Sequence, residues 1–317
     1  MAPESTRVDE RPTALDADGV LTWARRCVEL LAERRDEINR LNVFPVPDSD
    51  TGTNLLYTMR AALDRAEGED AWIAEGGGTA GAREIAVALG RGAVHGARGN
   101  SGVILSQVLR AVGEAATFTV VDASTYRRAL RTAVTLVYKA LSDPVEGTII
   151  TVLREAATGA VRSTANSLVE VARAAADSAA EALERTTSQL PALRRAGVVD
   201  AGGRGLLILL DTLVEVLTGE APDRPEYVIP EDPVLAACAD TGAGVTSREG
   251  GDEAAGSDTR YEVMYALSHS DDARADELRS VLRTLGDSVI VVGDGGSGEH
   301  ARWAVHVHTD DIGQAIE

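Results

Sequence analysis

The feature that most constrains this fold is a helical apolar periodicity that runs from about residue 19 to residue 218. The stretch is rich in alanine, leucine, arginine and glutamate, which favour helices, and no convincing strand pattern interrupts it. Helices joined by short loops pack as antiparallel neighbours, so the pattern predicts an antiparallel bundle or helical barrel within residues 15–218. The expected helices are 18–41, 53–66, 82–95, 101–116, 124–141, 147–161, 165–188 and 203–218.

The character of the chain changes after this stretch. Residues 219–258 are rich in proline, glycine and aspartate, which predicts a flexible linker, and residues 1–14 read as a disordered tail. A strand–helix–strand–strand order then predicts a small α/β domain at residues 259–317. We expect this domain to be truncated and the chain to be the front part of a longer protein. The expected elements are strands 261–268, 287–294 and 301–309 and a helix 271–286 with Leu278, Val281, Leu282 and Leu285 on one face.

Charge and composition exclude several classes of function. The formal net charge is −19, from 31 basic and 50 acidic residues, so free nucleic acid is not an expected partner. Cys27 and Cys238 are too few for a disulfide framework, and the N-terminus lacks the apolar core of a secretory signal, so we expect a cytoplasmic protein. No run approaches the ~20 apolar residues that a transmembrane segment needs. Lys139, the single lysine, lacks the glycines of a P-loop, so phosphate would be held by metal, backbone N–H groups or arginine.

The segment NVFPVPDSDTGTN at residues 42–54 carries two carboxylates, Asp48 and Asp50, one residue apart. In an extended segment the side chains of residues i and i+2 point to the same side, so both can reach one metal site. Mg²⁺ uses one or two carboxylates and leaves the other positions to water and phosphate. The alternative interpretation is an ordinary helix-capping turn.

Three polar residues beside this pair extend the predicted magnesium site. Asn42 could fold back as a third oxygen ligand of the metal. Thr51 and Thr53 could cap the following helix, whose N-terminal N–H groups favour an anion.

A glycine-rich segment, Gly96 to Gly102, precedes another apolar helix. Glycines let the backbone approach phosphate closely, and a helix N-terminus presents free N–H groups. The alternative is a plain loop with Ser101 as the N-cap. The candidate phosphate-binding residues are Arg98, Gly99, Asn100, Ser101 and Gly102.

Two further helices begin in the same way. Thr148 follows a glycine, and Asp200 precedes Gly202 and a strongly apolar helix. Each motif alone is more typical of a helix cap, but four helices begin with Gly plus Asp, Thr or Ser. In an alternating bundle such starts can gather at one end, which predicts a polar, nucleotide-sized site there.

The last predicted strand carries His306 and His308, which alternation places on one face. They could ligate zinc, with Glu262 on the first strand as the only obvious further ligand. The alternative is a solvated or hydrogen-bonded strand surface.

Taken together, four segments resemble the DhaL-type nucleotide-binding domain of dihydroxyacetone kinases, and more closely its bacterial fatty acid kinase branch. They are residues 41–54, 96–107, 144–152 and 198–206, in the order of that family, and residues 287–313 are similar to its middle domain. The resemblance implies an eight-helix antiparallel barrel that binds ATP or ADP and two Mg²⁺ ions at its open end. It implies metal binding by Asp48 and Asp50, and nucleotide contacts from the helix starts that hold Thr51, Thr53, Asn54, Ser101, Thr148, Asp200 and Gly202.

The chain departs from the family pattern at three positions. Asn42 is the nearest counterpart of a third aspartate in dihydroxyacetone kinases, and Glu262 stands where a cysteine is common beside the two histidines. Ser49 replaces a common glycine between the aspartates, and we expect it to be accommodated with a negative φ. From the resemblance we also expect the C-terminal domain of the fatty acid kinases to be missing from this chain.

The resemblance implies a phosphotransferase that moves the γ-phosphate of ATP to an acceptor presented by a partner protein, most simply a fatty acid carboxylate. No catalytic side chain is expected beyond the metal and phosphate site. The alternatives are a nucleotide subunit of a glycerone (dihydroxyacetone) kinase and a non-catalytic ATP-binding module. A fatty-acid-binding acceptor protein is the expected partner, and a homodimer is a further possibility.

Overall fold

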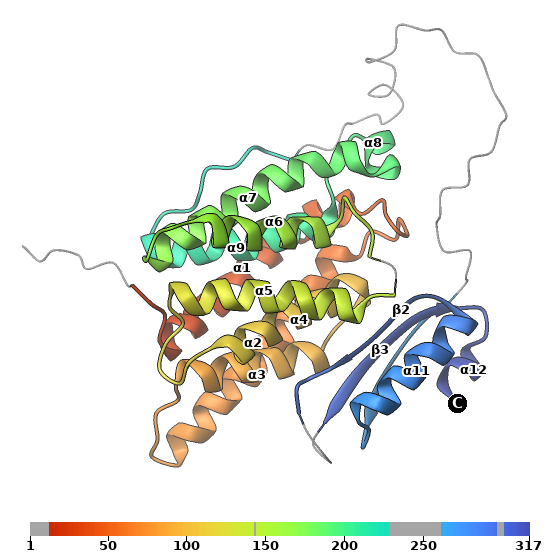
Figure 1. Cartoon of the computed structure of the whole chain (residues 1–317), viewed down its shortest axis with the longest axis horizontal. Helices are drawn as coiled ribbons and strands as arrows, with labels where there is room; N and C mark the ends of the chain where they lie inside the picture. The colour runs from red at the N-terminus through yellow and green to blue at the C-terminus, as the bar shows by residue number, and fades with distance from the viewer. Residues whose placement is uncertain (1–12, 143, 228–260, 297–300) are drawn as a thin grey trace, which may run out of the picture.

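The computed structural model describes residues 13–142, 144–227, 261–296 and 301–317. Figure 1 shows a helical domain with a small three-stranded sheet packed at one end of its helices. The predicted mainly helical fold, with a small α/β part at the C-terminal side, is confirmed. Most of the predicted tail and linker, including Cys238, lies outside the described residues.

The helical domain contains eight long helices and one short helix within its described part. Helix α3 has the predicted bounds, and most other ends differ from the prediction by one to three residues. Helix α2 differs most, since it continues to Glu75 where the prediction ended at residue 66. The isolated Gly68 does not stop the helix, which ends only at Gly76-Gly77-Gly78. The helices are α1 Ala17–Leu41, α2 Thr51–Glu75, α3 Ala82–His95, α4 Gly99–Ala115, α5 Ala123–Ala140, α6 Ile149–Arg162, α7 Leu168–Gln189, α8 Pro191–Ala196 and α9 Ala201–Thr218.

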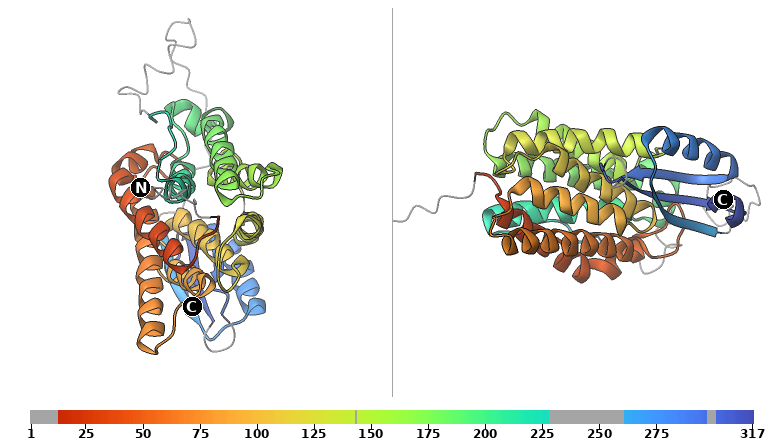
Figure 2. Two further views of the ribbon diagram at one scale, coloured as in Figure 1. Left: turned by 90° about the vertical axis from the view of Figure 1, so that its left-hand side faces the viewer. Right: turned by 90° about the horizontal axis from the view of Figure 1, so that it is seen from below.

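Consecutive helices pack side by side, and α9 closes the arrangement by packing against α1, α6 and α7. Figure 2 shows that the long axes of the helices are roughly aligned with one another and that the sheet lies across one end of the bundle. Helix α9 is apolar on nearly all sides and is buried along most of its length, as expected for a helix with neighbours all around it. The four helix starts singled out in the sequence, those of α2, α4, α6 and α9, lie at the end nearest the sheet.

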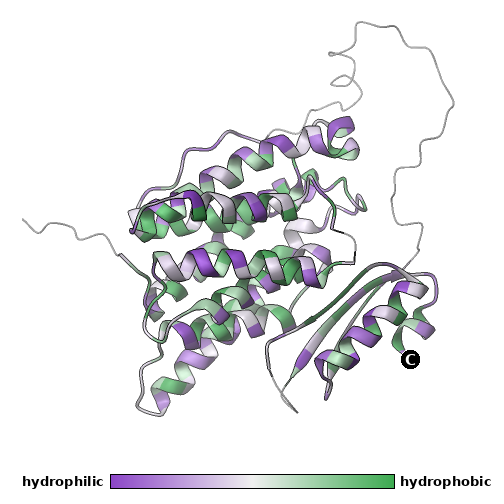
Figure 3. Cartoon of the chain, in the orientation of Figure 1, coloured by the Kyte–Doolittle hydropathy of each residue, from purple (hydrophilic) through white to green (hydrophobic). Residues whose placement is uncertain are grey.

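The small domain is an antiparallel sheet in the order β1–β3–β2. Figure 3 shows its strands mainly in the apolar colour, since β2 and β3 are buried on both faces. Of the four residues predicted to share one face of the helix at residues 271–286, Leu282 is buried and Leu278 and Leu285 pack against the core, whereas Val281 is 50% exposed at the edge of that face. The elements are β1 Tyr261–Ser268, α11 Asp272–Leu285, β2 Gly286–Gly293, β3 Arg302–Thr309 and a short α12 Ile312–Ile316 that was not predicted.

The two faces of the sheet bury different surfaces. Val289 and Val305 pack in the core that α11 covers, whereas Ile290 and Ala304 pack against Val94 and other residues of the helical domain. Hydrogen bonds also join the domains: Ser142 Oγ donates to the carbonyl of Val289 at 2.8 Å, and the Arg110 guanidinium donates to that of Gly293 at 2.8 Å. The sheet is therefore held over the end of the bundle where the four helix starts meet.

No helix in the described part of the chain is both long enough and apolar enough to cross a membrane.

Candidate functional site

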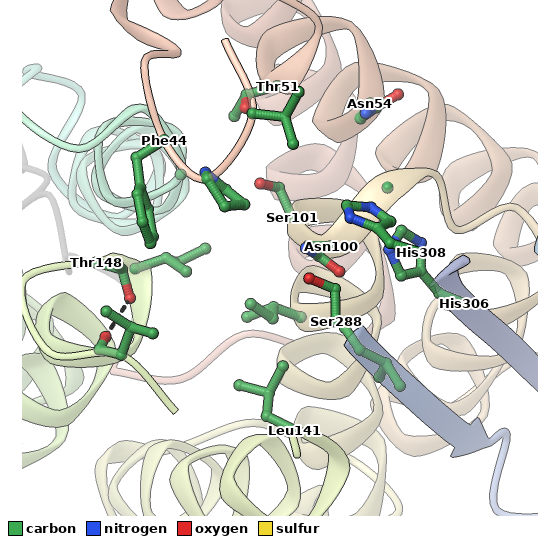
Figure 4. A pocket seen from close by; sticks show the side chains of 18 of the residues that line it. Phe44, Thr51, Asn54, Asn100, Ser101, Leu141, Thr148, Ser288, His306 and His308 are labelled. Carbon is green, nitrogen blue, oxygen red and sulfur yellow. Dashed lines mark hydrogen bonds between the residues drawn. The ribbon is translucent and has the colours of Figure 1, made fainter. Parts of the chain in front are cut away.

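A cavity of about 410 Å³ lies between the end of the helical domain and the sheet. Figure 4 shows side chains from both domains converging on it. The size is within the range of small-ligand sites in proteins. Fourteen of the predicted site residues line the cavity: Asn42, Asp48, Asp50, Thr51, Asn54, Gly99, Asn100, Ser101, Thr148, Asp200, Gly202, Glu262, His306 and His308.

The aspartate pair sits in a network of amide groups. The Asn42 side chain donates through Nδ2 to Asp48 Oδ1 at 2.9 Å, and the Asn54 amide donates to Asp50 Oδ2 at 2.8 Å. The amide oxygen of Asn42 accepts a hydrogen bond from the Thr51 hydroxyl. Both polar atoms of the Asn42 amide are thus engaged, and in this structure Asn42 orients the Asp48 carboxylate.

The two carboxylates perturb each other. Asp48 lines the cavity and is exposed, yet partial desolvation, together with the adjacent Asp50 carboxylate, raises the pKa of Asp48 to about 6. Two neighbouring carboxyl groups resist being ionised together unless a cation joins them. The pair is therefore arranged to gain from a bound metal ion.

Two local expectations for this segment are wrong. Helix α2 begins at Thr51, and its N-cap Asp50 makes no side-chain capping bond, so Thr51 and Thr53 lie inside the first turn and are not caps. Thr53 is turned away from the cavity, where Asn39 of α1 bonds both its hydroxyl and its backbone N–H. Ser49 has a φ of +57°, not a negative one, because the turn between the aspartates passes through the left-handed region that favours glycine.

The glycine-rich segment forms the start of α4. The helix begins at Gly99, whose φ is +54°, so Ser101 lies in the first turn and is not the N-cap. Ser101 and Asn100 line the cavity, and Asn100 Oδ1 is buried without a hydrogen-bond partner. The other two candidates lie outside the lining: Arg98 is exposed with its guanidinium over the Tyr57 ring, and Gly102 packs against Thr58.

Thr148 and Asp200 are the N-caps of α6 and α9, and both also line the cavity. Thr148 accepts from the N–H of Ile150, and Asp200 Oδ2 accepts from the N–H of Gly203 at 2.7 Å. Burial raises the pKa of Asp200 to about 6. Both the capping interpretation and the cavity position therefore hold for these two residues.

The histidine pair and Glu262 also face the cavity. His306 Nδ1 lies 3.2 Å from Glu262 Oε1, and the centroids of the two imidazole rings are 4.9 Å apart. One ligand atom from each of the three residues lies within 4.8 Å of the others, and neither nitrogen of the buried His306 has a hydrogen-bond partner of good geometry. Burial and the neighbouring His306 lower the pKa of His308, which favours the neutral ring that metals bind. Three ligand residues match the number typical of a catalytic zinc site, whereas a structural site normally has four.

The electrostatics of the cavity favour cations. Its lining, as far as the chain is described, contains no arginine or lysine. A polyphosphate could enter only with metal ions, supported by hydroxyl and backbone N–H donors. The carboxylates of the lining are Asp48, Asp50, Asp200, Glu262 and Asp287.

Sequence reasoning missed part of the wall. It placed the His306 pair in a separate domain site, whereas the structure puts it in the same cavity as the aspartates. It also missed the apolar side formed by Phe44 and Leu141, and the contribution of Ser288. The Phe-Pro-Val-Pro sequence directly before the aspartates could have indicated an apolar wall, but nothing near Ser288 in the sequence indicates that this residue lines the cavity.

Comparison with known proteins identifies the family of each part of the chain. The family model of the DAK2 domain matches residues 45–215, and that of the FakA-like (fatty acid kinase) middle domain matches residues 258–317. The first family thus covers more than half of the chain.

Several curated bacterial proteins are similar over most of the chain. Protein YloV of Bacillus subtilis (strain 168) is 32% identical over 295 residues, which cover 90% of this chain and 50% of that protein. A Staphylococcus saprophyticus protein is 32% identical over 291 residues, covering 90% and 49%, and a Staphylococcus aureus (strain USA300) protein is 32% identical over 314 residues, covering 95% and 52%. The chain therefore spans about half the length of these curated relatives.

Among solved structures, the dihydroxyacetone kinase of C. freundii in its native form matches with a TM-score of 0.42 and 20% sequence identity. The match covers 68% of this chain and 37% of that one.

Proposed function

The chain belongs to the DAK2-domain family, and from this membership we propose that it is the ATP-binding subunit of a kinase that phosphorylates an acceptor presented by a partner protein. The observation that carries the proposal is the meeting of Asp48 and Asp50 with the starts of α4, α6 and α9 around one cavity. Carboxylates supply metal ligands, and helix starts supply N–H groups and hydroxyls for phosphate.

The donor set fits magnesium. Asp48 and Asp50 offer hard carboxylate oxygens, and Asn100 Oδ1 is a buried acceptor that lacks a donor, as a metal-bound water could provide. We assign metal binding to the two aspartates, with Asn42 holding Asp48 in place. Magnesium would neutralise phosphate charge in a cavity whose described lining has no arginine or lysine. The apolar wall at Phe44 and Leu141 would accommodate the nucleobase.

The acceptor we favour is a fatty acid carboxylate, because the second domain matches the FakA-like middle domain of fatty acid kinases. A carboxylate is already ionised at neutral pH and needs no general base. It needs position and charge neutralisation, which metal ions and backbone dipoles supply. The sheet carries His306, His308 and Glu262 to the same cavity, where we propose that they hold a second kind of metal, most simply zinc.

The test of this proposal is Mg-ATP binding by wild-type protein and by Asp48→Ala, measured by isothermal titration calorimetry. We expect wild-type protein to bind and Asp48→Ala to lose binding while its helical circular dichroism is unchanged. Asp64→Ala is the matched control, since Asp64 is an exposed aspartate on α2 outside the cavity lining. Equal ATP affinity in Asp48→Ala and wild type would overturn the metal assignment.

Acceptor assays separate the possible reactions. ATP consumption with a fatty-acid-binding protein loaded with fatty acid supports an acyl phosphate product. Consumption only with dihydroxyacetone and its binding protein supports a glycerone kinase. Binding of ATP without turnover in either assay supports a non-catalytic module.

A further inference from the structure

Strand β2 contains a bulge at the point where it enters the cavity wall. Asp287 pairs with His308 and Ile290 pairs with His306, so β2 advances three residues while β3 advances two. In a regular strand Asp287 and Val289 would lie on the same face of the sheet, but the extra residue places them on opposite faces. Beyond the bulge, Val289 and Val291 face α11 and Ile290 faces the helical domain, yet Asp287 also lies on the cavity side. Bulges of this kind often re-aim a side chain beside an active site.

Ser288 is the residue that the bulge re-aims. Its φ is +52°, in the left-handed region that residues other than glycine seldom occupy. Its side chain is half-buried in the cavity wall, and Figure 4 shows it pointing into the same space as Asn100. No hydrogen bond joins the Ser288 hydroxyl to another residue of the described chain. A serine in a conformation suited to glycine, with an unused hydroxyl facing a cavity, is the pattern of strain retained at a binding site.

The chemistry of the cavity indicates what this hydroxyl would bind. Phosphate oxygens need donors, and the described lining supplies neither lysine nor arginine. The helical domain contributes Ser101 and backbone N–H groups at the start of α4. On the β2 side of the cavity, the Ser288 hydroxyl can donate to a phosphate oxygen, whereas the adjacent Asp287 carboxylate can only accept.

We propose that Ser288 donates a hydrogen bond to a phosphate group of the nucleotide, so that the nucleotide is bound between the two domains. This inference rests on the proposed function and extends it, because it makes the small domain part of the nucleotide site. A nucleotide bound in this way would hold the sheet against the end of the bundle. The Asn100 amide, on the opposite wall, would limit the position of the same phosphate.

The experiment measures Mg-ATP affinity and thermal stability in wild type, Ser288→Ala and Ser288→Gly. Loss of a hydrogen bond to a charged phosphate should weaken ATP binding about tenfold in both variants. Glycine also removes the backbone strain, so Ser288→Gly should raise the melting temperature of the ligand-free protein by roughly 2 °C, whereas Ser288→Ala should not. A purely structural serine would not give weaker binding together with higher stability.

His269→Gly is the matched control. His269 has a φ of +58° in an exposed turn outside the cavity lining, so this variant should be stabilised without any change in ATP affinity. ATP binding by wild type with unchanged affinity in both Ser288 variants would overturn the inference and leave the proposed function standing. Weaker binding in Ser288→Gly alone would assign the effect to the backbone and also overturn it. Absence of ATP binding in wild type would refute the proposed function itself, and the Ser288 contact with it.

Discussion

Glu262 Oε1 lies 3.2 Å from His306 Nδ1 across the β1–β3 ladder, diagonal to the direct pair of Glu262 and His308. The contact lowers the pKa of the Glu262 carboxyl, so this group is ionised at neutral pH. His306 is buried with its second ring nitrogen also lacking a partner. A buried imidazole whose two nitrogens lack a hydrogen-bond partner of good geometry, beside a carboxylate, supports the metal site proposed above.

The first prediction concerns this cluster. Metal-free protein should bind one equivalent of Co²⁺, with the visible absorption of a tetrahedral or five-coordinate site, and Zn²⁺ should displace it. Glu262→Gln removes a charged ligand and should weaken binding by at least about tenfold. Glu277→Gln, at an exposed glutamate of α11, is the control and should bind as wild type does. Identical titrations for both variants would show that Glu262 is not a ligand.

The second prediction is a pH dependence of stability caused by Asp200. Burial raises the pKa of this carboxyl to about 6 from 3.8, so the folded state holds the proton more tightly than the unfolded state does. The protonated Asp200 therefore contributes its full share to the free energy of unfolding below about pH 4. This contribution, about 3 kcal/mol, is lost as the pH rises through about 6. Asp200→Asn keeps an oxygen for the Gly203 N–H but cannot ionise.

Urea unfolding of wild type and Asp200→Asn, without added metal, measures this effect. The variant should be about as stable as wild type near pH 4 and more stable at pH 8. A stability difference that stays constant across this pH range would contradict the raised pKa. The same variant should bind Mg-ATP more weakly if the Asp200 charge contributes to the site.

The helix starts were predictable because their signals are local. Asp200 and Thr148 can be recognised as helix caps from the residues that directly follow them. Because successive helices run in alternating directions, such helix starts are expected to gather at one end of the bundle. The placement of the sheet over that end was not predictable, because it depends on an apolar cluster that joins distant segments, with Val103 of α4 and Ile290 of β2 among its members. The bulge at Ser288 was missed for a related reason: it is defined by pairing with β3, and β2 alone reads as a regular strand.

The third prediction follows from Ser49, whose φ of +57° contradicts the sequence expectation. Ser49→Gly should stabilise the protein by about 1 kcal/mol, because glycine adopts this conformation without the steric penalty. Ser49→Ala removes the same hydroxyl but keeps the strain, so it should give no gain. Guanidinium unfolding of the three proteins separates the two effects, and equal stability of the alanine and glycine variants would rule out strain as the cause.

The fourth prediction concerns the ion pair between Arg204 of α9 and Glu37 of α1. Arg204 Nε donates to Glu37 Oε1 at 2.8 Å, the side chains are 10% and 17% exposed, and the guanidinium lies 4.9 Å from the Tyr227 ring centroid. Glu37→Ala should lower the free energy of unfolding by about 3 kcal/mol, because it leaves a buried charge without its partner. Arg204→Met in the same background should recover much of that loss, since no charge then remains buried.

A double-mutant cycle with urea unfolding measures this coupling. The exposed pair of Arg25 and Glu67, with side chains 50% and 43% exposed, is the comparison, and Glu67→Ala should change stability by less than about 1 kcal/mol. Additive effects of the Glu37 and Arg204 substitutions would show that the two charges are not coupled. Arg204 lies about one turn after Asp200, so we expect the ion pair to help hold the start of α9, which lines the cavity. Glu37→Ala should for that reason weaken Mg-ATP binding, and the Arg204→Met double variant should regain part of it.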